Sequence, residues 1–223
     1  RNQISGTIHD ELGGATNLQH LYLNHNSLSG KLTVAALSTL KRLVRLQLND
    51  NSLTNSLPAA FMDMKNLVYM YLQNNNLNGI WPEFGNLIKL QYFDASSNTF
   101  SIANRLPQKL LGVNCTSLRT FLCNSCNLYG PIPDIKPALG ARDSGSFGNM
   151  NDLHIFEAKN NFLNGSIPAS MERLQDIHKI SLENNALSGT IPTSLFSFPS
   201  NLGYVYLQDN KLIGSIPVSS SNI

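Results

Sequence analysis

Residues 177–192 read Ile-His-Lys-Ile-Ser-Leu-Glu-Asn-Asn-Ala-Leu-Ser-Gly-Thr-Ile-Pro, and they indicate how the whole chain folds. Ile180 and Leu182 lie two residues apart, which is the period of a β-strand, so both side chains point to one face. Asn185 follows, and then Gly189 leads into Ile-Pro. Glycine permits a tight bend, and proline, which has no N–H, restricts strand pairing. The stretch therefore predicts a short strand, a bend at a buried amide and a second bend.

The same pattern recurs along the 223 residues. The Asn position is occupied, in order, by Asn2, Asn26, Asn51, Asn75, Asn98, Cys126, Asn161, Asn185 and Asn210. Successive positions are 24, 25, 24, 23, 28, 35, 24 and 25 residues apart. Apart from the two long intervals, this spacing fits a leucine-rich repeat of 20–29 residues. We therefore predict a solenoid with a half repeat over 1–17 and full repeats beginning near residues 18, 43, 67, 90, 118, 153, 177 and 202.

Stacking is what makes such a repeat stable. One turn cannot bury its own apolar edge, but neighbouring turns together bury a continuous column. The strands are expected to form a parallel sheet at about 4.8 Å spacing on the concave side. The Asn side chain, which can both donate and accept, is expected to be buried in every turn and to satisfy backbone groups of neighbouring turns. The fold class is thus an α/β solenoid.

The consensus at 177–192 resembles the plant-type leucine-rich repeat, and the resemblance covers essentially the whole chain. Receptor-like kinase ectodomains, receptor-like proteins and polygalacturonase-inhibiting proteins carry this repeat. The resemblance implies a right-handed superhelix, a second short strand at Gly-x-Ile-Pro, and convex segments that are mostly 3₁₀ or loop. The chain departs from complete members of the family: it lacks cysteine-paired caps, a transmembrane segment and a kinase domain.

Two intervals break the regularity. Residues 102–107 replace the Gly-x-Ile-Pro element, and a Gly/Ser-rich insertion occupies about 134–151. Such an insertion could contact a ligand, but a tolerated surface loop is the favoured interpretation because loop-closure entropy grows slowly with length. The first turn is cut at Asn2, and no polar capping repeat follows Leu212. We therefore expect both ends to be artificial boundaries, covered by further chain or by a partner.

Composition excludes several classes of function. The net charge is +2 and charged residues make up 13%, about half the ~25% of typical soluble domains. A nucleic-acid surface, which needs clustered Lys and Arg, is therefore not expected. No apolar run approaches the ~18 residues of a membrane helix.

Catalytic, metal and cofactor sites are not expected either. Cys123 and Cys126 form a Cys-x-x-Cys, but no second ligand pair accompanies them, and in the repeat frame both point inward, as does Cys115. We expect three free core thiols, on the argument that an extended chain separates residues 123 and 126 by ~10 Å. The five histidines are spread along the solenoid without a nucleophile motif. The chain is therefore predicted not to be an enzyme.

The candidate binding site is the outward surface of the concave sheet, where packing imposes no residue identity. In its N-terminal half one column holds His20, Arg45, Tyr69 and Tyr92, and the adjacent column holds Tyr22, Gln47, Tyr71 and Asp94. Tyr and Arg are enriched at binding hot spots, although aromatic residues are also good strand formers. The predicted ligand-binding residues are His20, Tyr22, Arg45, Tyr69, Tyr71, Tyr92 and Asp94.

Other outward residues have weaker claims. Tyr204 and Tyr206 form a smaller pair at the far end, and Glu157, Lys159, Lys179 and Glu183 are expected to form a solvated mixed-charge patch. Asn114 and Asn164 are outward-facing N-glycosylation acceptors, which favours a secreted chain.

The leading hypothesis is a recognition module of a cell-surface receptor that binds a peptide, glycan or protein ligand on its concave face. The alternatives are a secreted inhibitor-type protein and a structural or ice-binding scaffold. For the last, Thr7, Ser56, Ser166, Thr190 and Ser215 form a hydroxyl column that Lys31, Ile80 and Pro131 interrupt. A co-receptor or larger assembly is a possible partner, and an extracellular or cell-surface location is expected.

Overall fold

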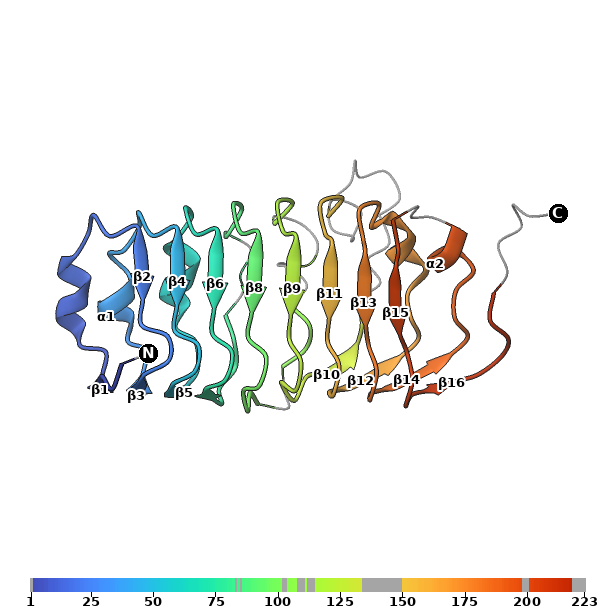
Figure 1. Ribbon diagram of the computed structural model, residues 1–223, viewed down its shortest axis with the longest axis horizontal. Helices are drawn as coiled ribbons and strands as arrows, with labels where there is room; N and C mark the ends of the chain where they lie inside the picture. The colour runs from blue at the N-terminus through green and yellow to red at the C-terminus, as the bar shows by residue number, and fades with distance from the viewer. Residues whose placement is uncertain are drawn as a thin grey trace.

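The computed structural model describes residues 2–82, 84, 86–101, 104–107, 111, 115–133, 150–197 and 201–217. It confirms the solenoid. Parallel strands form one eight-stranded sheet in the order β15-β13-β11-β9-β8-β6-β4-β2. Figure 1 shows these strands side by side along the length of the molecule. Their bounds are β2 (His20–Tyr22), β4 (Arg45–Gln47), β6 (Tyr69–Tyr71), β8 (Tyr92–Asp94), β9 (Thr120–Leu122), β11 (Ile155–Glu157), β13 (Lys179–Ser181) and β15 (Tyr204–Tyr206).

Two four-stranded sheets, β1-β3-β5-β7 and β10-β12-β14-β16, run along one edge of the large sheet (Figure 1). Their strands are β1 (Ser5–Thr7), β3 (Ser27–Lys31), β5 (Ser52–Asn55), β7 (Asn76–Leu77), β10 (Tyr129–Pro131), β12 (Phe162–Gly165), β14 (Ala186–Gly189) and β16 (Lys211–Leu212). Strand β14 ends at Gly189, before Ile191 and Pro192, so the second strand lies a few residues earlier than expected.

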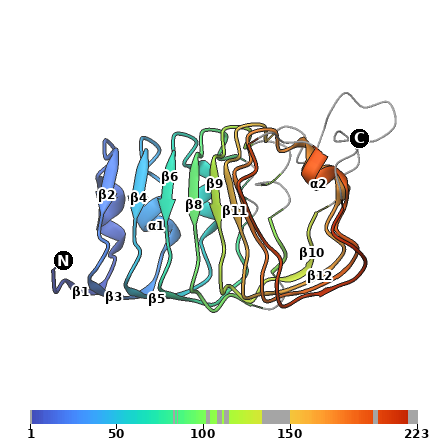
Figure 2. The same ribbon diagram turned by 45° about the vertical axis from the view of Figure 1, so that its right-hand side comes forward.

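Short helical turns lie on the side of the molecule opposite the large sheet. They are the 3₁₀ helices η1 (Asp10–Gly14), η2 (Ala59–Asp63) and η4 (Ala169–Arg173), and the four-residue helices α1 (Val34–Leu37) and α2 (Ser194–Ser197). Figure 2 shows α1 behind the strands of the large sheet. None of the helices in the described part of the chain combines the length and apolarity that a membrane crossing requires.

The core lies between the large sheet and these turns. The central residue of each large-sheet strand points into it, and from β4 to β13 this residue is fully buried: Leu46, Met70, Phe93, Phe121, Phe156 and Ile180. On the edge strands β2 and β15 the equivalent Leu21 and Val205 are half-buried, because each has a neighbouring strand on one side. Repeated burial of the same position is what holds the turns in register.

The asparagine ladder forms as predicted in its hydrogen bonds. The Oδ1 of Asn75 accepts from the N–H of Leu53 (3.0 Å), and its Nδ2 donates to the carbonyl of Leu48 (3.0 Å) in the preceding turn. The prediction that the ladder asparagine is buried in every full turn is wrong for four of the seven full turns that have one. Asn75, Asn98 and Asn161 are buried, whereas Asn26, Asn51, Asn185 and Asn210, which lie in the two turns nearest each end, are half-buried.

Each ladder residue follows a residue with a left-handed backbone. These residues are His25, Asp50, Asn74, Ser97, Ser125, Asn160, Asn184 and Asp209, with φ between 54° and 56°. Short polar side chains tolerate this region better than most residues. The glycine of the Gly-x-Ile-Pro element also has positive φ, for example 75° at Gly165, as its predicted role in a tight bend requires.

The three cysteines lie in the core, as expected, and are free. Cys126 takes the ladder position, where its Sγ donates to the carbonyl of Ala95 (3.1 Å). The expected ~10 Å extended separation of residues 123 and 126 is wrong, because the chain turns at Ser125. The two thiols, of Cys123 and Cys126, are hydrogen-bonded to each other. Burial, followed by this contact, raises the pKa of Cys123 well above its usual range, and burial raises that of Cys115 to about 12.

We expect these thiols to be unreactive in the folded protein. Burial keeps reagents away from all three thiols. The thiolate is the reactive species, and the raised pKa of Cys115 and of Cys123 keeps the thiolate population of these two residues low. A thiol-specific colorimetric reagent at pH 8 should react slowly with the native chain and should find three thiols after denaturation without reductant. Rapid native reaction, or fewer than three thiols, would contradict the assignment of all three cysteines to the core.

Candidate functional site

The large sheet displays the predicted columns in register. His20 pairs with Arg45, Arg45 with Tyr69, and Tyr69 with Tyr92. The second column runs in the same way from Tyr22 through Gln47 and Tyr71 to Asp94. Strand period and repeat length together thus bring side chains from four turns onto one surface.

Four of these side chains contact one another on β4, β6 and β8. The Arg45 guanidinium lies 4.1 Å from the ring centroid of Tyr69 and 5.8 Å from that of Tyr71. Tyr71 and Tyr92 stack at 4.5 Å between centroids. We call Arg45, Tyr69, Tyr71 and Tyr92 the aromatic–cationic patch. All four are half-buried, so each keeps exposed area for a ligand while its rotamer is restrained by its neighbours.

His20 and Tyr22 extend this surface onto β2. Both side chains are exposed, Tyr22 at 56%, and their rings lie 6.1 Å apart. They share the columns of the patch but are less constrained than its four members. They would therefore lose more side-chain freedom on binding a ligand.

Two phenols of the patch, those of Tyr71 and Tyr92, stay protonated over a wide pH range. Burial raises the pKa of Tyr92 to about 12, and the neighbouring Asp94 carboxylate adds to the effect. Burial also raises the pKa of Tyr71, against the opposing influence of the Arg45 guanidinium. Both hydroxyls are therefore neutral donors at physiological pH, and Arg45 supplies the positive charge of the patch.

Asp94 differs from the expectation of an accessible outward carboxylate. Its position follows the second column, but its side chain is only 6% exposed. The carboxylate accepts a hydrogen bond from the N–H of Ser96 (2.9 Å), and burial raises its pKa. Asp94 therefore supports the turn after β8 and offers little surface to a ligand.

The raised pKa of Tyr92 predicts a pH dependence of stability. Unfolded Tyr92 ionises near pH 10.0 and folded Tyr92 near 12, so between these values the folded state binds more protons. Its contribution is complete below pH 10 and is lost as pH rises towards 12. The loss of stability between pH 9.5 and 11.5, measured by urea unfolding, should be smaller in Tyr92→Phe, which has no ionisable hydroxyl. An unchanged loss would contradict the assignment.

A hollow of about 410 Å³ lies beside the patch, along the side of the large sheet where the N-terminal ends of its strands lie. We call it the edge hollow. Its lining is Gln19, Arg42, Val44, Asn66, Val68 and Lys89. Gln19, Val44 and Val68 directly precede the first residues of β2, β4 and β6, so the hollow adjoins His20, Arg45 and Tyr69. Sequence reasoning missed it because it considered only the positions between the leucines.

The far half of the sheet is charged but internally paired. Lys179 Nζ lies 2.7 Å from Glu157 Oε1, and Lys159 Nζ lies 3.6 Å from Glu183 Oε1. Burial opposes ionisation of Glu157, but hydrogen bonds from Lys179 and Asn124 outweigh it and lower its pKa. The expectation of a solvated patch is wrong for the glutamates, since Glu183 is only 8% exposed and the Glu157 side chain 13%. Cross-strand pairing thus covers the two glutamates, whereas the side chains of Lys159 and Lys179 remain 40% and 33% exposed.

The expected glycosylation sites have different outcomes. Asn164 lies on β12, where its side chain is half-buried and in register with Pro131. Its exposed fraction leaves it a candidate acceptor, as the sequence suggests. Asn114 and residues 134–149 of the expected insertion lie outside the described residues.

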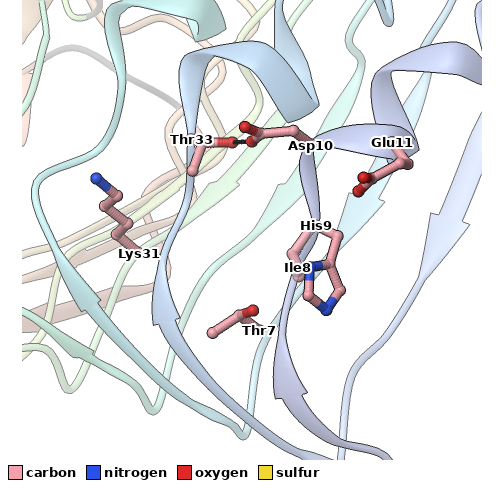
Figure 3. A pocket seen from close by; sticks show the side chains of 7 residues that line it. All are labelled: Thr7, Ile8, His9, Asp10, Glu11, Lys31 and Thr33. Atoms are coloured by element: carbon pink, nitrogen blue, oxygen red, sulfur yellow. Dashed lines mark hydrogen bonds between the residues drawn. The ribbon is translucent and has the colours of Figure 1, made fainter.

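A second hollow of about 300 Å³ lies near β1 and β3, lined by Thr7, Ile8, His9, Asp10, Glu11, Lys31 and Thr33 (Figure 3). The Asp10 carboxylate accepts a hydrogen bond from the Thr33 hydroxyl, and Lys31 extends away from it (Figure 3). The lining mixes both signs of charge without converging on one point. Among the described residues no group of three His, Cys, Asp or Glu side chains could hold a metal ion.

Comparison with known proteins agrees with the fold. Family models described as leucine-rich repeat match residues 17–37 and 41–100. Lumican of Homo sapiens is 32% identical over 155 residues, which are 60% of this chain and 44% of that lumican. Lumican of Oryctolagus cuniculus is 32% identical over 139 residues, which are 52% of this chain and 68% of that lumican. Receptor-like protein 39 of Arabidopsis thaliana is 32% identical over 99 residues, 43% of this chain and 11% of that protein.

Solved structures match over more of the chain. The Arabidopsis receptor kinase HAESA, in complex with the peptide hormone IDA and the co-receptor SERK1, is 29% identical with a TM-score of 0.86, covering 97% of this chain and 33% of HAESA. The plant peptide hormone receptor RGFR1, in complex with RGF2, is 28% identical with a TM-score of 0.85, covering 95% and 31%. This chain thus spans about a third of each receptor chain and less than half of human lumican. The chain belongs to the leucine-rich-repeat family, and its repeats resemble those of plant receptor ectodomains.

Proposed function

We propose that this chain is a non-catalytic recognition module that binds an extended peptide across β2, β4, β6 and β8 of the concave face, as part of a cell-surface receptor. The observation that carries the proposal is the aromatic–cationic patch, in which Arg45 and three tyrosines from three turns restrain one another at 4.1–5.8 Å. Restrained aromatic and Arg side chains provide binding area at a low cost in side-chain entropy.

Two comparisons support a peptide rather than another ligand. HAESA is in complex with the peptide hormone IDA, and the peptide hormone receptor RGFR1 is in complex with RGF2. Both structures match nearly the whole length of this chain. A peptide lying along the solenoid would cross successive strands about 4.8 Å apart and would meet one side chain of each column per turn. The extracellular face of a membrane is the corresponding location.

The lumican match favours a second candidate, a secreted binding module without a signalling domain. The two candidates share the concave-face site and differ in what the rest of the gene product contains. A membrane span and a kinase domain encoded after Ile223 would support the receptor, and a stop codon soon after it would support the secreted module.

Peptide selection tests the binding proposal directly. A random dodecapeptide phage library would be selected against the chain, and enriched peptides would be synthesised with a fluorescent label for anisotropy measurements. We expect Tyr69→Ala and Tyr71→Ala each to weaken binding at least about thirtyfold, the effect of a hot-spot residue worth ~2 kcal/mol. The melting temperature should fall by no more than a few degrees, since both side chains lie outside the core.

The matched control is the tyrosine pair at the other end of the same sheet. Tyr204 and Tyr206 occupy the same two columns on β15, but Tyr204 contacts His178 and Tyr206 lies by the paired Lys179. Replacing both by alanine should leave affinity within about twofold. A larger effect of the control pair than of Tyr69 and Tyr71, or no peptide enrichment, would overturn the proposed function.

A further inference from the structure

The edge hollow is continuous with the aromatic–cationic patch. Val44 and Val68 in its wall are the residues before Arg45 and Tyr69, and their backbones join adjacent turns, with Val68 N–H donating to the carbonyl of Val44 (2.8 Å). A peptide bound on the patch can therefore place the next residue of its chain in the hollow, past the N-terminal ends of β4 and β6. The two valines give the hollow an apolar floor, which suits the methylene groups of a ligand side chain.

Cations surround that floor. Arg42 and Lys89 are both exposed and come from different turns. Between them Asn66 is fixed by two hydrogen bonds: its Nδ2 donates to the carbonyl of Lys41 (3.0 Å), and its Oδ1 accepts from Lys89 Nζ (2.8 Å). Lys89 is thus held at the hollow by a neutral amide, which leaves its positive charge uncompensated.

No carboxylate in the described part of the chain forms an ion pair with Arg42, Arg45 or Lys89. The far half of the sheet is different, because Lys159 and Lys179 are each paired with a glutamate. The acidic groups near the patch are also occupied. Asp94 is buried, and Asp50, at the opposite strand edge, is engaged by His25 (3.2 Å), Asn49 (2.6 Å) and Asn74 (2.7 Å). In the N-terminal half of the large sheet, the positive charges beside the edge hollow are therefore not paired with a described carboxylate.

We propose that the edge hollow binds a carboxylate of the peptide, so that the ligand is an acidic peptide whose Asp or Glu side chain lies between Arg42 and Lys89 while its neighbouring residues cover the aromatic–cationic patch. The inference rests on the proposed function and adds the charge of the ligand and its placement across the strands. Exposed cations of this kind contribute to the specificity and the association rate of binding, and salt weakens their attraction for an acidic ligand.

The test uses the same dodecapeptide library. Peptides enriched on the chain should carry net negative charge, relative to the unselected library. An analogue in which each Asp and Glu is replaced by Asn and Gln should bind about five- to tenfold more weakly at 50 mM salt, the combined effect of two exposed charge contacts. The difference should shrink at 500 mM salt, where the screening length is far shorter than at 50 mM.

The variant Arg42→Gln/Lys89→Gln should bind the acidic peptide five- to tenfold more weakly and should no longer distinguish it from its neutral analogue. This loss of discrimination is the coupling that a double-mutant cycle measures. The control Lys31→Gln/Lys211→Gln removes the same charge from β3 and β16, outside the large sheet, and should retain the discrimination.

The two proposals fail in distinguishable ways. If enriched peptides depend on Tyr69 and Tyr71 but have no acidic bias, or if Arg42→Gln/Lys89→Gln still discriminates, the edge hollow is not a carboxylate site although the proposed function stands. If binding of all peptides is independent of Tyr69 and Tyr71, the proposed function fails first. If the control variant loses discrimination equally, overall charge explains the effect, and the assignment to the hollow is overturned.

Discussion

Replacing Asn161 by alanine should lower the free energy of unfolding by about 4 kcal/mol, because several buried backbone groups would lose their partner at once. Asn161 Oδ1 accepts from the N–H groups of Cys126 (2.9 Å) and Leu128 (3.0 Å). Its Nδ2 donates to the carbonyls of Cys123 (2.7 Å) and Ala158 (3.0 Å). The side chain is 6% exposed, so water cannot readily replace it. Urea unfolding monitored by circular dichroism measures the loss.

Asn26→Ala is the matched control, because it removes the same side chain from a half-buried position. Asn26 bonds the N–H of Ile4 (3.1 Å) and the carbonyls of Leu23 and Asn24, in a turn that water reaches. We expect it to cost about 1 kcal/mol or less. Equal losses at the two positions would show that the ladder bond itself, rather than its burial, determines the contribution.

The register of the concave columns could be predicted from the sequence because two fixed periods determine it. Side chains alternate every two residues along a strand, and the ladder residue recurs at a nearly constant interval, so His20, Arg45, Tyr69 and Tyr92 have to align. The long intervals do not disturb the alignment, since extra residues lie between strands. β9 and β11 remain paired, Phe121 with Phe156, across the widest gap.

The environment of individual side chains could not be predicted in the same way. Asp94 and Tyr71 occupy the same column, yet Asp94 is buried while Tyr71 is half-buried, because Asp94 turns to the N–H of Ser96. The pair Lys179–Glu157 joins different columns on adjacent strands, β13 and β11. Such contacts depend on side-chain rotamers and on neighbours in the same or the adjacent turn, and the residue order within a single column does not specify them.

Two sequence features could have revealed more. Arg42 and Lys89 each lie three residues before their strand, at equivalent positions of two turns, and this spacing aligns them beside the patch. The residue before each ladder position is Asn, Asp, Ser or His in all eight full turns, which matches the left-handed backbone found there. Both features lie outside the leucine pattern from which the fold was inferred.

The second large effect is expected at the centre of the core, where Phe121→Ala should lower the free energy of unfolding by about 4 kcal/mol. Phe121 is fully buried on β9 and stacks between Phe93 and Phe156, with centroids 5.5 Å and 5.6 Å away. Truncation therefore leaves a cavity bounded by two rings from adjacent strands. These strands flank the two longest repeat intervals, so continuity of the core there depends on side-chain packing.

Phe162→Ala makes the same substitution on β12, where the ring is 55% exposed, and should change stability by less than about 0.5 kcal/mol. Both variants should bind the selected peptide with unchanged affinity at a temperature where they are folded, because neither side chain belongs to the patch or to the edge hollow. A cost below about 1 kcal/mol for Phe121→Ala would mean that the stack is not what holds β8, β9 and β11 together. Weakened peptide binding by folded Phe121→Ala would instead show that the core at β9 positions Tyr92 on the adjacent strand β8. Peptide affinity would then depend on core packing as well as on the residues of the surface columns.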